Sequence, residues 1–511
     1  MSILTGRERA FLEAVSRTSF CNPFLPELVD YERQALGEDF VEEEAVWSMR
    51  VADPDKPRAN SWKITERLHP LIDQLRERLT RDPAATGKEL ELYEDALLFW
   101  LYYRYYERIF AAALTEPSRR TTGGRWGFYG QFLQDWLHHF RIAGVELPTR
   151  HEPAHTFACY CQIVRAFHNI FGHIIGGSLP AARLRAAVWQ SIFTHDMRRY
   201  RRTLYARMGD FASLITGPSG TGKELVARAI ALSRYIPFDD KRMTFEDEFS
   251  GLFHPINIAA LPGTLVESEL FGHRRGSFTG AIQDKRGWLE ACTPLGSVFL
   301  DEIGDLDPSI QVKLLRVIET RTFFAVGDTV GRKFQGKLIA ATNRDLSQAI
   351  DQGRFREDLY FRLCSDLIVT PSLSQQIRES PGVLRDLVLF MARRVAGPEA
   401  ASLAAEAQEW ILSSLGPDYE WPGNYRELEQ CVRNLLIRKD YRPPHARRSE
   451  SASDLFQPAS AGKLTAAELL SRYCTLVYAR TGSYEETARR LDIDRRTVKS
   501  KIDPALLERL Q

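Results

Sequence analysis

The chain has 511 residues and a mass of 58.4 kDa, which is too long for one hydrophobic core and predicts about three or four domains. Its formal net charge of +1 excludes a basic surface spread over the whole molecule, so any nucleic-acid contact must be local. The seven cysteines are odd in number and scattered, which argues against a disulfide framework and for the reducing cytoplasm.

The first region, residues 1–185, is predicted to be all helical because apolar residues recur at helical spacing, as in Ile163–Ile175. Its most apolar run, Leu97–Leu114, contains charged residues such as Arg104. Charges in the middle of a membrane span are costly, so we expect a buried helix and no membrane contact. The many aromatic residues of the region are expected in a helical core, and an aromatic-lined pocket is the less common alternative.

Histidines in this region are not expected to bind a metal. His151 and His155 have the spacing of neighbours on a helix, but Pro153 lies between them and is expected to prevent a helix there.

Residues 186–375 alternate short β-branched runs with helical segments, which predicts a parallel sheet covered by helices on both faces. The expected strands end at Thr216, Ala259, Glu302, Thr342 and Thr370. A helical segment follows over 376–440, then a Pro-, Ser- and Ala-rich linker over 441–463, and a second helical segment over 464–511.

A phosphate-binding loop is predicted at GPSGTGKE, between an expected strand and an expected helix. Its glycines allow backbone N–H groups to surround phosphates, and Lys223 adds a positive charge at the helix N-terminus. Glu224 stands where a Ser or Thr usually helps to hold Mg²⁺. The residues predicted to bind nucleotide are Gly217, Pro218, Ser219, Gly220, Thr221, Gly222, Lys223 and Glu224. An ordinary glycine turn is the alternative for this motif alone.

A pair of carboxylates follows the apolar strand in SVFLDEIGDL. Asp301 and Glu302 come at its carboxyl end, where α/β proteins bind ligands. Asp301 is predicted to hold Mg²⁺ and Glu302 to polarise the attacking water. A pair that only caps the next helix is the alternative. Together with the phosphate loop, the pair predicts hydrolysis of ATP with Mg²⁺.

The segment ESELFGHRRGSFTGA, Glu267–Ala281, resembles the central AAA+ domain of sigma-54-dependent transcriptional activators, also called bacterial enhancer-binding proteins. That family carries a GAFTGA loop, and Ser277 replaces its alanine here. The resemblance implies that the loop contacts sigma-54, chiefly through Phe278 and Thr279. The loop residues are Gly276, Ser277, Phe278, Thr279, Gly280 and Ala281. A Phe between glycines gains little from packing unless it meets a partner, although a buried Phe at a tight turn is the alternative.

In GRFREDLYFRL, Arg356 and Arg362 match the family's arginine fingers, which reach the γ-phosphate in the neighbouring subunit. Catalytic groups supplied by a neighbour imply a ring, a hexamer by resemblance, with a dimer at rest as a further possibility. Two arginines on a solvated helix face are the alternative interpretation.

Further motifs of the family follow in its order. Thr342 and Asn343 match the first sensor beside the γ-phosphate, and Asn257 matches the asparagine that restrains the catalytic glutamate. Arg426, in WPGNYRELEQ, matches the second sensor in the helical lid. The segment TPSLSQQIRES departs from the family's pattern, so no residue in it is given a role.

Residues 482–502 have the dimensions of a helix–turn–helix, with Ile493 in the turn. Asp492 stands where such motifs often have Gly, which Asp tolerates because it enters the left-handed region readily. The segment resembles the Fis-type DNA-binding domain, and an amphipathic hairpin is the alternative. The residues predicted to contact DNA are Arg495, Arg496, Thr497, Lys499 and Lys501.

The predicted fold class is multidomain: an all-α regulatory or sensory domain, an α/β AAA+ P-loop core with a helical lid, and an all-α helix–turn–helix domain. The resemblance implies a cytoplasmic ATPase that binds double-stranded DNA and remodels RNA polymerase holoenzyme containing sigma-54. Two other hypotheses stay open. One is an AAA+ remodeller of a non-transcriptional client. The other is a nucleotide-regulated DNA-binding repressor without productive sigma-54 contact, which the replacement of the loop alanine by Ser277 favours.

Overall fold

The computed structural model describes residues 2–42, 58–114, 126–149, 152–249, 251–443, 464–504 and 506–507. The chain divides into two compact units, Met1–Arg433 and Asn434–Gln511. Of the helices in the described ranges, none combines the length and the apolar character needed to cross a membrane.

The first unit begins with a helical region, as predicted. Its helices are α1 (Gly6–Phe20), α2 (Glu27–Leu36), α3 (Ala59–Arg81), α4 (Gly87–Leu114), α5 (Tyr129–Phe140), α6 (Pro153–His173), α7 (Leu179–Phe193) and α8 (Met197–Arg202). A capping box starts α1: the Thr5 hydroxyl accepts a hydrogen bond from the Glu8 amide, and the Glu8 carboxylate accepts one from the Thr5 amide. The apolar run in α4 is buried, while Arg104 pairs with Asp135 at 2.7 Å on the surface.

Pro153 begins α6 instead of preventing it, so the expectation of no helix there is wrong. Proline fits the first turn of a helix because its missing N–H would have no partner there. His155 lies in α6, where its ring contacts the Tyr235 hydroxyl at 2.8 Å, and His151 lies outside the described residues.

Five parallel strands follow in the order β11-β1-β10-β7-β4, which confirms the predicted α/β sheet. They are β1 (Ser213–Thr216), β4 (Phe253–Asn257), β7 (Ser297–Asp301), β10 (Lys337–Thr342) and β11 (Leu367–Val369). Because β10 lies between β1 and β7, the carboxyl ends of these three strands meet at one edge of the sheet.

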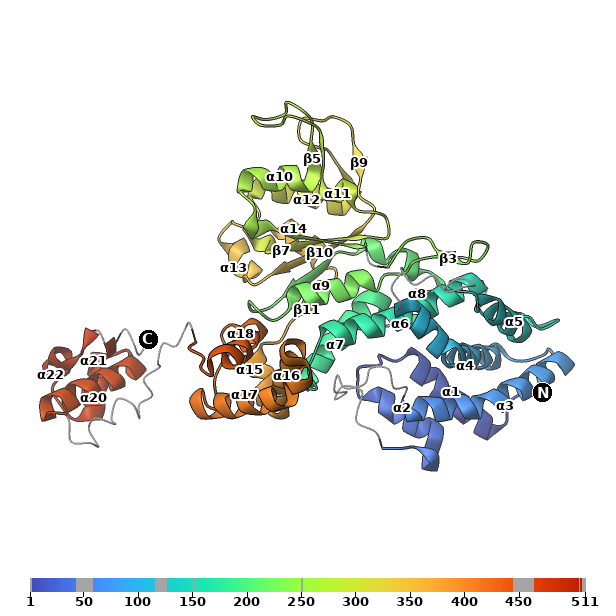
Figure 1. Cartoon of the computed structure of the whole chain (residues 1–511), viewed down its shortest axis with the longest axis horizontal. Helices are drawn as coiled ribbons and strands as arrows, with labels where there is room; N and C mark the ends of the chain where they lie inside the picture. The colour runs from blue at the N-terminus through green and yellow to red at the C-terminus, as the bar shows by residue number, and fades with distance from the viewer. Residues whose placement is uncertain are drawn as a thin grey trace. The chain divides into compact units, whose positions relative to one another are not determined.

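Helices cover both faces of the sheet (Figure 1). Alternate side chains point to opposite faces: Leu214 and Leu300 pack toward α10 (Gly263–Phe271) and α12 (Pro308–Thr320), while Ile215 packs toward α6, α7 and α9 (Lys223–Leu232). The other elements of the α/β region are α11 (Trp288–Ala291), α13 (Leu346–Asp351), α14 (Glu357–Leu363), β2 (Phe238–Asp239), β3 (Thr244–Phe245), β5 (Gly272–His273), β6 (Lys285–Arg286), β8 (Thr322–Phe323) and β9 (Arg332–Lys333).

The predicted domain boundary at residue 185 falls inside α7, with no linker there. Val188, Trp189 and Ile192 of this helix are buried in the same core cluster as Ile339 of the sheet. The helical region and the α/β core therefore share one continuous core, because α6 and α7 supply part of the cover of the sheet.

The helical lid contains α15 (Leu373–Glu379), α16 (Gly382–Ala396), α17 (Ala400–Ser414) and α18 (Asn424–Arg438). Residues 444–463 of the predicted linker lie outside the described residues. The second unit contains α20 (Ala466–Thr481), α21 (Tyr484–Leu491) and α22 (Arg495–Lys501). Asp492 adopts the left-handed conformation predicted for it, with φ 52° and ψ 44°, and ends α21.

Candidate nucleotide site and exposed loop

The predicted phosphate loop connects β1 to the N-terminus of α9. Three of its glycines have positive φ: Gly217 (146°), Gly220 (77°) and Gly222 (88°). A Cβ on Gly220 would lie 2.2 Å from the Gly423 carbonyl oxygen, so both conformation and space require glycine there. The Lys223 ammonium folds over the loop and donates to the carbonyl oxygens of Gly217 at 3.0 Å and Pro218 at 3.1 Å.

The predicted carboxylates lie together at the end of β7. The Asp301 carboxylate accepts a hydrogen bond from the Glu302 amide at 3.1 Å, and the Glu302 carboxylate accepts one from the Asn343 amide at 3.3 Å. Burial, and then the negative charge of Glu302, raise the pKa of Asp301. A divalent cation fits this pair, because it relieves the repulsion between two carboxylates and prefers oxygen ligands.

Electrostatics connect the carboxylates to the phosphate loop. Burial lowers the pKa of Lys223, and the negative charges of Glu302 and Asp301 oppose that shift. The structure thus brings together the lysine, the two carboxylates and Asn343 at the carboxyl ends of β1, β7 and β10. These are the groups needed to hold phosphates, a cation and a water molecule.

Two other predicted residues have different contacts. Glu224 forms an exposed ion pair with Arg228 at 3.2 Å, one turn along α9, and its carboxylate occupies the outer surface of the helix. The Asn257 side chain accepts from the Ala260 amide at 3.2 Å, which ends β4 and starts a 3₁₀ turn. Within the described residues, no hydrogen bond joins Asn257 to Glu302.

The lid closes directly on the phosphate loop. The Asn424 amide group donates to the Ser219 carbonyl oxygen at 2.9 Å, and the Tyr425 N–H donates to the Gly220 carbonyl oxygen at 3.1 Å. Arg426 lies close enough that its charge lowers the pKa of Lys223. Asn424 was not predicted as a site residue. The WPGNYRELEQ motif contains the sequence feature that could have identified it. Asn424 follows a Pro-Gly pair and adopts the left-handed conformation, φ 51°, which Asn tolerates better than most residues.

The two predicted arginine fingers lie on the surface at α14. Arg356 makes two hydrogen bonds to Asp358, at 3.0 and 2.7 Å, and Arg362 makes one to Glu319 at 3.1 Å. All four side chains are at least 40% exposed. Exposed ion pairs exchange partners at little cost, so both guanidinium groups can be released to a phosphate outside this chain.

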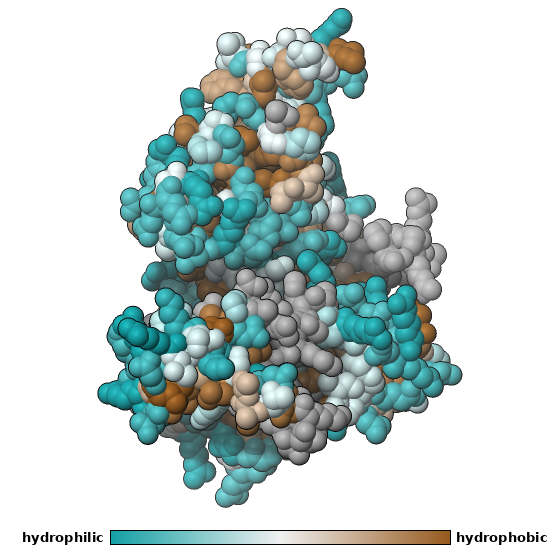
Figure 2. Space-filling model, turned by 90° about the vertical axis from the view of Figure 1, so that its left-hand side faces the viewer, coloured by the Kyte–Doolittle hydropathy of each residue, from teal (hydrophilic) through white to brown (hydrophobic). Residues whose placement is uncertain are grey.

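The GSFTGA loop follows β5 and folds back on itself. The Gly276 amide donates to the Ala281 carbonyl oxygen at 2.8 Å, and Gly276 and Gly280 have φ of 79° and 102°. Phe278 is 37% exposed and contacts His273 edge-on, with ring centroids 5.0 Å apart. Figure 2 shows apolar side chains exposed at the upper end of the molecule, where Figure 1 places β5 and β9.

Ser277 packs against the neighbouring loop between β8 and β9. A Cβ on Gly327 would lie 2.5 Å from the Ser277 Cβ, and the Ser277 hydroxyl is buried without a hydrogen-bond partner. Arg274 holds the two loops together through ion pairs with Asp284 at 2.6 Å and Asp328 at 3.0 Å.

The glycine-rich loop, the paired carboxylates and the sheet order define the class of the protein: it contains a P-loop ATPase domain of the AAA+ type, closed by a helical lid. Comparison with known proteins identifies the particular family. Residues 193–368 match the family model described as the sigma-54 interaction domain.

Relatives agree with this match. The regulatory protein LuxO of Vibrio cholerae is 34% identical over 326 residues, which cover 60% of this chain and 67% of LuxO. The DNA-binding transcriptional regulator NtrC of Rhizobium meliloti is 39% identical over 236 residues, which cover 46% of this chain and 45% of NtrC. The chain therefore belongs to the family of sigma-54-dependent transcriptional activators, although it spans less than half the length of NtrC.

Solved structures give a weaker likeness. The crystal structure of NtrX from Brucella abortus in complex with ATP has 24% sequence identity, a TM-score of 0.39 and coverage of 71% of this chain and 77% of that chain.

Proposed function

We propose that this protein is an ATP-dependent transcriptional activator that binds upstream DNA and remodels RNA polymerase holoenzyme containing sigma-54, so that the promoter opens. The observation that carries the proposal is the exposed GSFTGA loop on an ATPase core. Phe278 presents an aromatic ring to solvent between two glycines with positive φ, a costly arrangement unless a partner covers the ring.

ATP hydrolysis follows from the groups around the phosphate loop. The loop amides and Lys223 bind the phosphates, and Lys223 exchanges its carbonyl partners for phosphate oxygens. Asp301 would hold Mg²⁺, which neutralises phosphate charge when bound. Glu302 orients the attacking water and accepts its proton. Arg356 and Arg362 of one subunit act on the nucleotide of the next, so the active form is a ring, a hexamer by family resemblance.

Nucleotide state reaches the loop through a short path. The loop follows α10 and β5, and the buried side chains of α10 lie in the same core cluster as Val298 and Leu300 of β7, the strand that ends in Asp301. Arg274 ties the base of the loop to two carboxylates, and its ion pair with Asp284 is exposed and therefore rearranges readily. Phe278 and Thr279 then contact sigma-54 when the loop is released.

The second unit would select the promoter by binding DNA. The N-terminal residues of α22, Arg495, Arg496 and Thr497, would enter the major groove, and Lys499 and Lys501 would contact phosphates. The protein would act in the cytoplasm, where the polymerase is.

The experiment is capture of sigma-54 by the full-length protein with ADP–aluminium fluoride, which stabilises the transition-state form of the ATPase. Wild type is expected to retain sigma-54, and Phe278→Ala to lose it. Ile282→Ala is the matched control, because Ile282 is 82% exposed next to the loop and has no assigned role. If wild type hydrolyses ATP but never retains sigma-54, the proposal fails and a remodeller of another client becomes the better hypothesis.

A further inference from the structure

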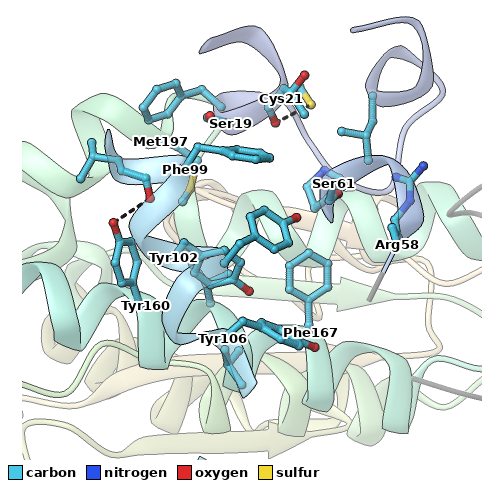
Figure 3. Close-up of a pocket in the computed structure, with 18 of the residues that line it drawn as sticks. Ser19, Cys21, Arg58, Ser61, Phe99, Tyr102, Tyr106, Tyr160, Phe167 and Met197 are labelled. Carbon is cyan, nitrogen blue, oxygen red and sulfur yellow. Dashed lines mark hydrogen bonds between the residues drawn. The ribbon is translucent and has the colours of Figure 1, made fainter. Parts of the chain in front are cut away.

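A cavity of about 210 Å³ lies inside the helical region, between α1, α2, α3, α4, α6, α7 and α8. Aromatic rings line it from several sides, as Figure 3 shows for Phe99, Tyr102, Tyr106 and Phe167. Protein interiors leave few voids larger than a water molecule, and an apolar cavity of about 150 Å³ can hold benzene. This cavity therefore has room for one aromatic ring with a short substituent.

A buried cation also lines the cavity. Arg201, in α8, is 5% exposed, and its guanidinium lies 5.9 Å from the centre of the Tyr160 ring. Its Nε and Nη2 atoms are buried and have no hydrogen-bond partner among the described residues. Buried guanidinium groups are stable when hydrogen-bonded to an anion, so these two donors mark the position of a missing acceptor.

The groups around Arg201 leave its charge only partly compensated. Burial raises the pKa of Glu94 to about 7, against the positive charge of Arg201, so this carboxyl is partly protonated at neutral pH. Burial raises the pKa of the nearby Cys159 thiol to about 11, against the charge of Arg201 and a hydrogen bond with its side chain, so the thiol is neutral. Arg58, which also lines the cavity, is already paired with Glu32 at 2.6 Å. The cavity thus favours a ligand that carries one negative charge.

We propose that this cavity binds a small aromatic carboxylate, with the ring between the aromatic side chains and the carboxylate on the Nε and Nη2 atoms of Arg201. The planar guanidinium matches a carboxylate through two parallel hydrogen bonds. The ring replaces empty volume with contacts to α4 and α6.

One wall of the cavity, α6, also holds the helix that follows the phosphate loop. Gln162 donates to the Ser233 carbonyl oxygen at 3.0 Å, and Arg165 donates to the Leu232 carbonyl oxygen at 2.6 Å. These carbonyls belong to the C-terminal end of α9, whose first residue is Lys223. A ligand in the cavity therefore stabilises α6 and, through it, the last turn of α9.

The test is calorimetric titration of the full-length protein with phenylacetate, its uncharged analogue phenylacetamide, and acetate, which lacks the ring. Phenylacetate is expected to bind about tenfold tighter than either, the difference that one charge-assisted contact or one buried ring supplies. Arg201→Gln is expected to remove this preference for phenylacetate over phenylacetamide. Arg202→Gln is the matched control, since Arg202 is the exposed neighbour in the same helix.

A second variant keeps the test decisive if Arg201→Gln does not fold. Val164→Phe places a ring in the cavity from α6 and is expected to abolish binding of phenylacetate while ATP still binds. Hydrogen exchange in α6 and the end of α9 is expected to slow when phenylacetate binds. Equal affinity for phenylacetate and phenylacetamide, or unchanged binding by Val164→Phe, would overturn the proposal. So would a wild type that binds none of benzoate, phenylacetate and 3-phenylpropionate at about 10 mM.

Discussion

Replacement of Asn424 by alanine will loosen the lid from the phosphate loop. Asn424 is buried, donates to the Ser219 carbonyl oxygen at 2.9 Å and accepts from the Leu373 amide at 2.8 Å. It thereby joins three segments that are far apart in the sequence: the phosphate loop, the start of α15 and the start of α18.

The free-energy cost of Asn424→Ala follows from these contacts. Each hydrogen bond contributes about 0.5–1.5 kcal/mol net, so the two together contribute about 1–3 kcal/mol. Alanine in the left-handed conformation that Asn424 adopts costs about 1 kcal/mol more than asparagine. The sum, about 2–4 kcal/mol, corresponds to roughly a 30-fold to 900-fold increase in the population with the lid released.

Hydrogen exchange measures this population directly, because the Tyr425 N–H donates to the Gly220 carbonyl oxygen only when the lid is closed. Glu420→Ala is the matched control, since it removes an exposed lid ion pair with Arg378 that contributes less than about 1 kcal/mol. The reasoning is refuted if Asn424→Ala exchanges like wild type, or if both variants accelerate exchange equally.

Three further predictions concern the loop and the catalytic groups. Ser277→Ala removes a buried hydroxyl without a partner, which costs about 1–3 kcal/mol, so exchange of the loop amides will slow; faster exchange would contradict this. The raised pKa of Asp301 means that the carboxyl ionises, and Mn²⁺ binds with ATP, only at higher pH than for an ordinary aspartate. Glu302→Gln removes the negative charge that helps to raise the pKa of Asp301, so the pH at the midpoint of Mn²⁺ binding will fall. An unchanged midpoint would contradict this assignment. Lys223→Ala and Arg356→Ala, each inactive alone, will regain ATPase activity on mixing, because one subunit supplies the arginine to the other's nucleotide; no recovery would exclude catalysis in trans.

Much of the ATPase core was predictable because its signals are local. Short β-branched runs predicted the five strands, and strand order then brought Asp301 and Asn343 to the phosphate loop. The ends of strands were less accurate: β4 ends at Asn257, two residues early, because its side chain caps the next turn. β7 ends at Asp301 because Glu302 turns to φ 56°.

Features that depend on long-range packing were not predictable. The domain boundary expected at residue 185 is wrong because α7 buries Trp189 against the sheet. No local sequence pattern indicates that contact. A proline between two histidines at helical spacing predicts a broken helix, but Pro153 lies in the first turn of α6, where proline is tolerated. Arg201 looks like any surface arginine in the sequence, and only the packing of α8 buries it beside the cavity.

The central claim is that ATP hydrolysis drives promoter opening through the GSFTGA loop. The most direct measurement is open-complex formation by sigma-54 holoenzyme on a pre-melted promoter, with ATPase activity recorded in the same reaction for wild type and Thr279→Ala. We predict that wild type opens the promoter, and that Thr279→Ala hydrolyses ATP but leaves the promoter closed. Wild type that hydrolyses ATP without opening the promoter would contradict the claim.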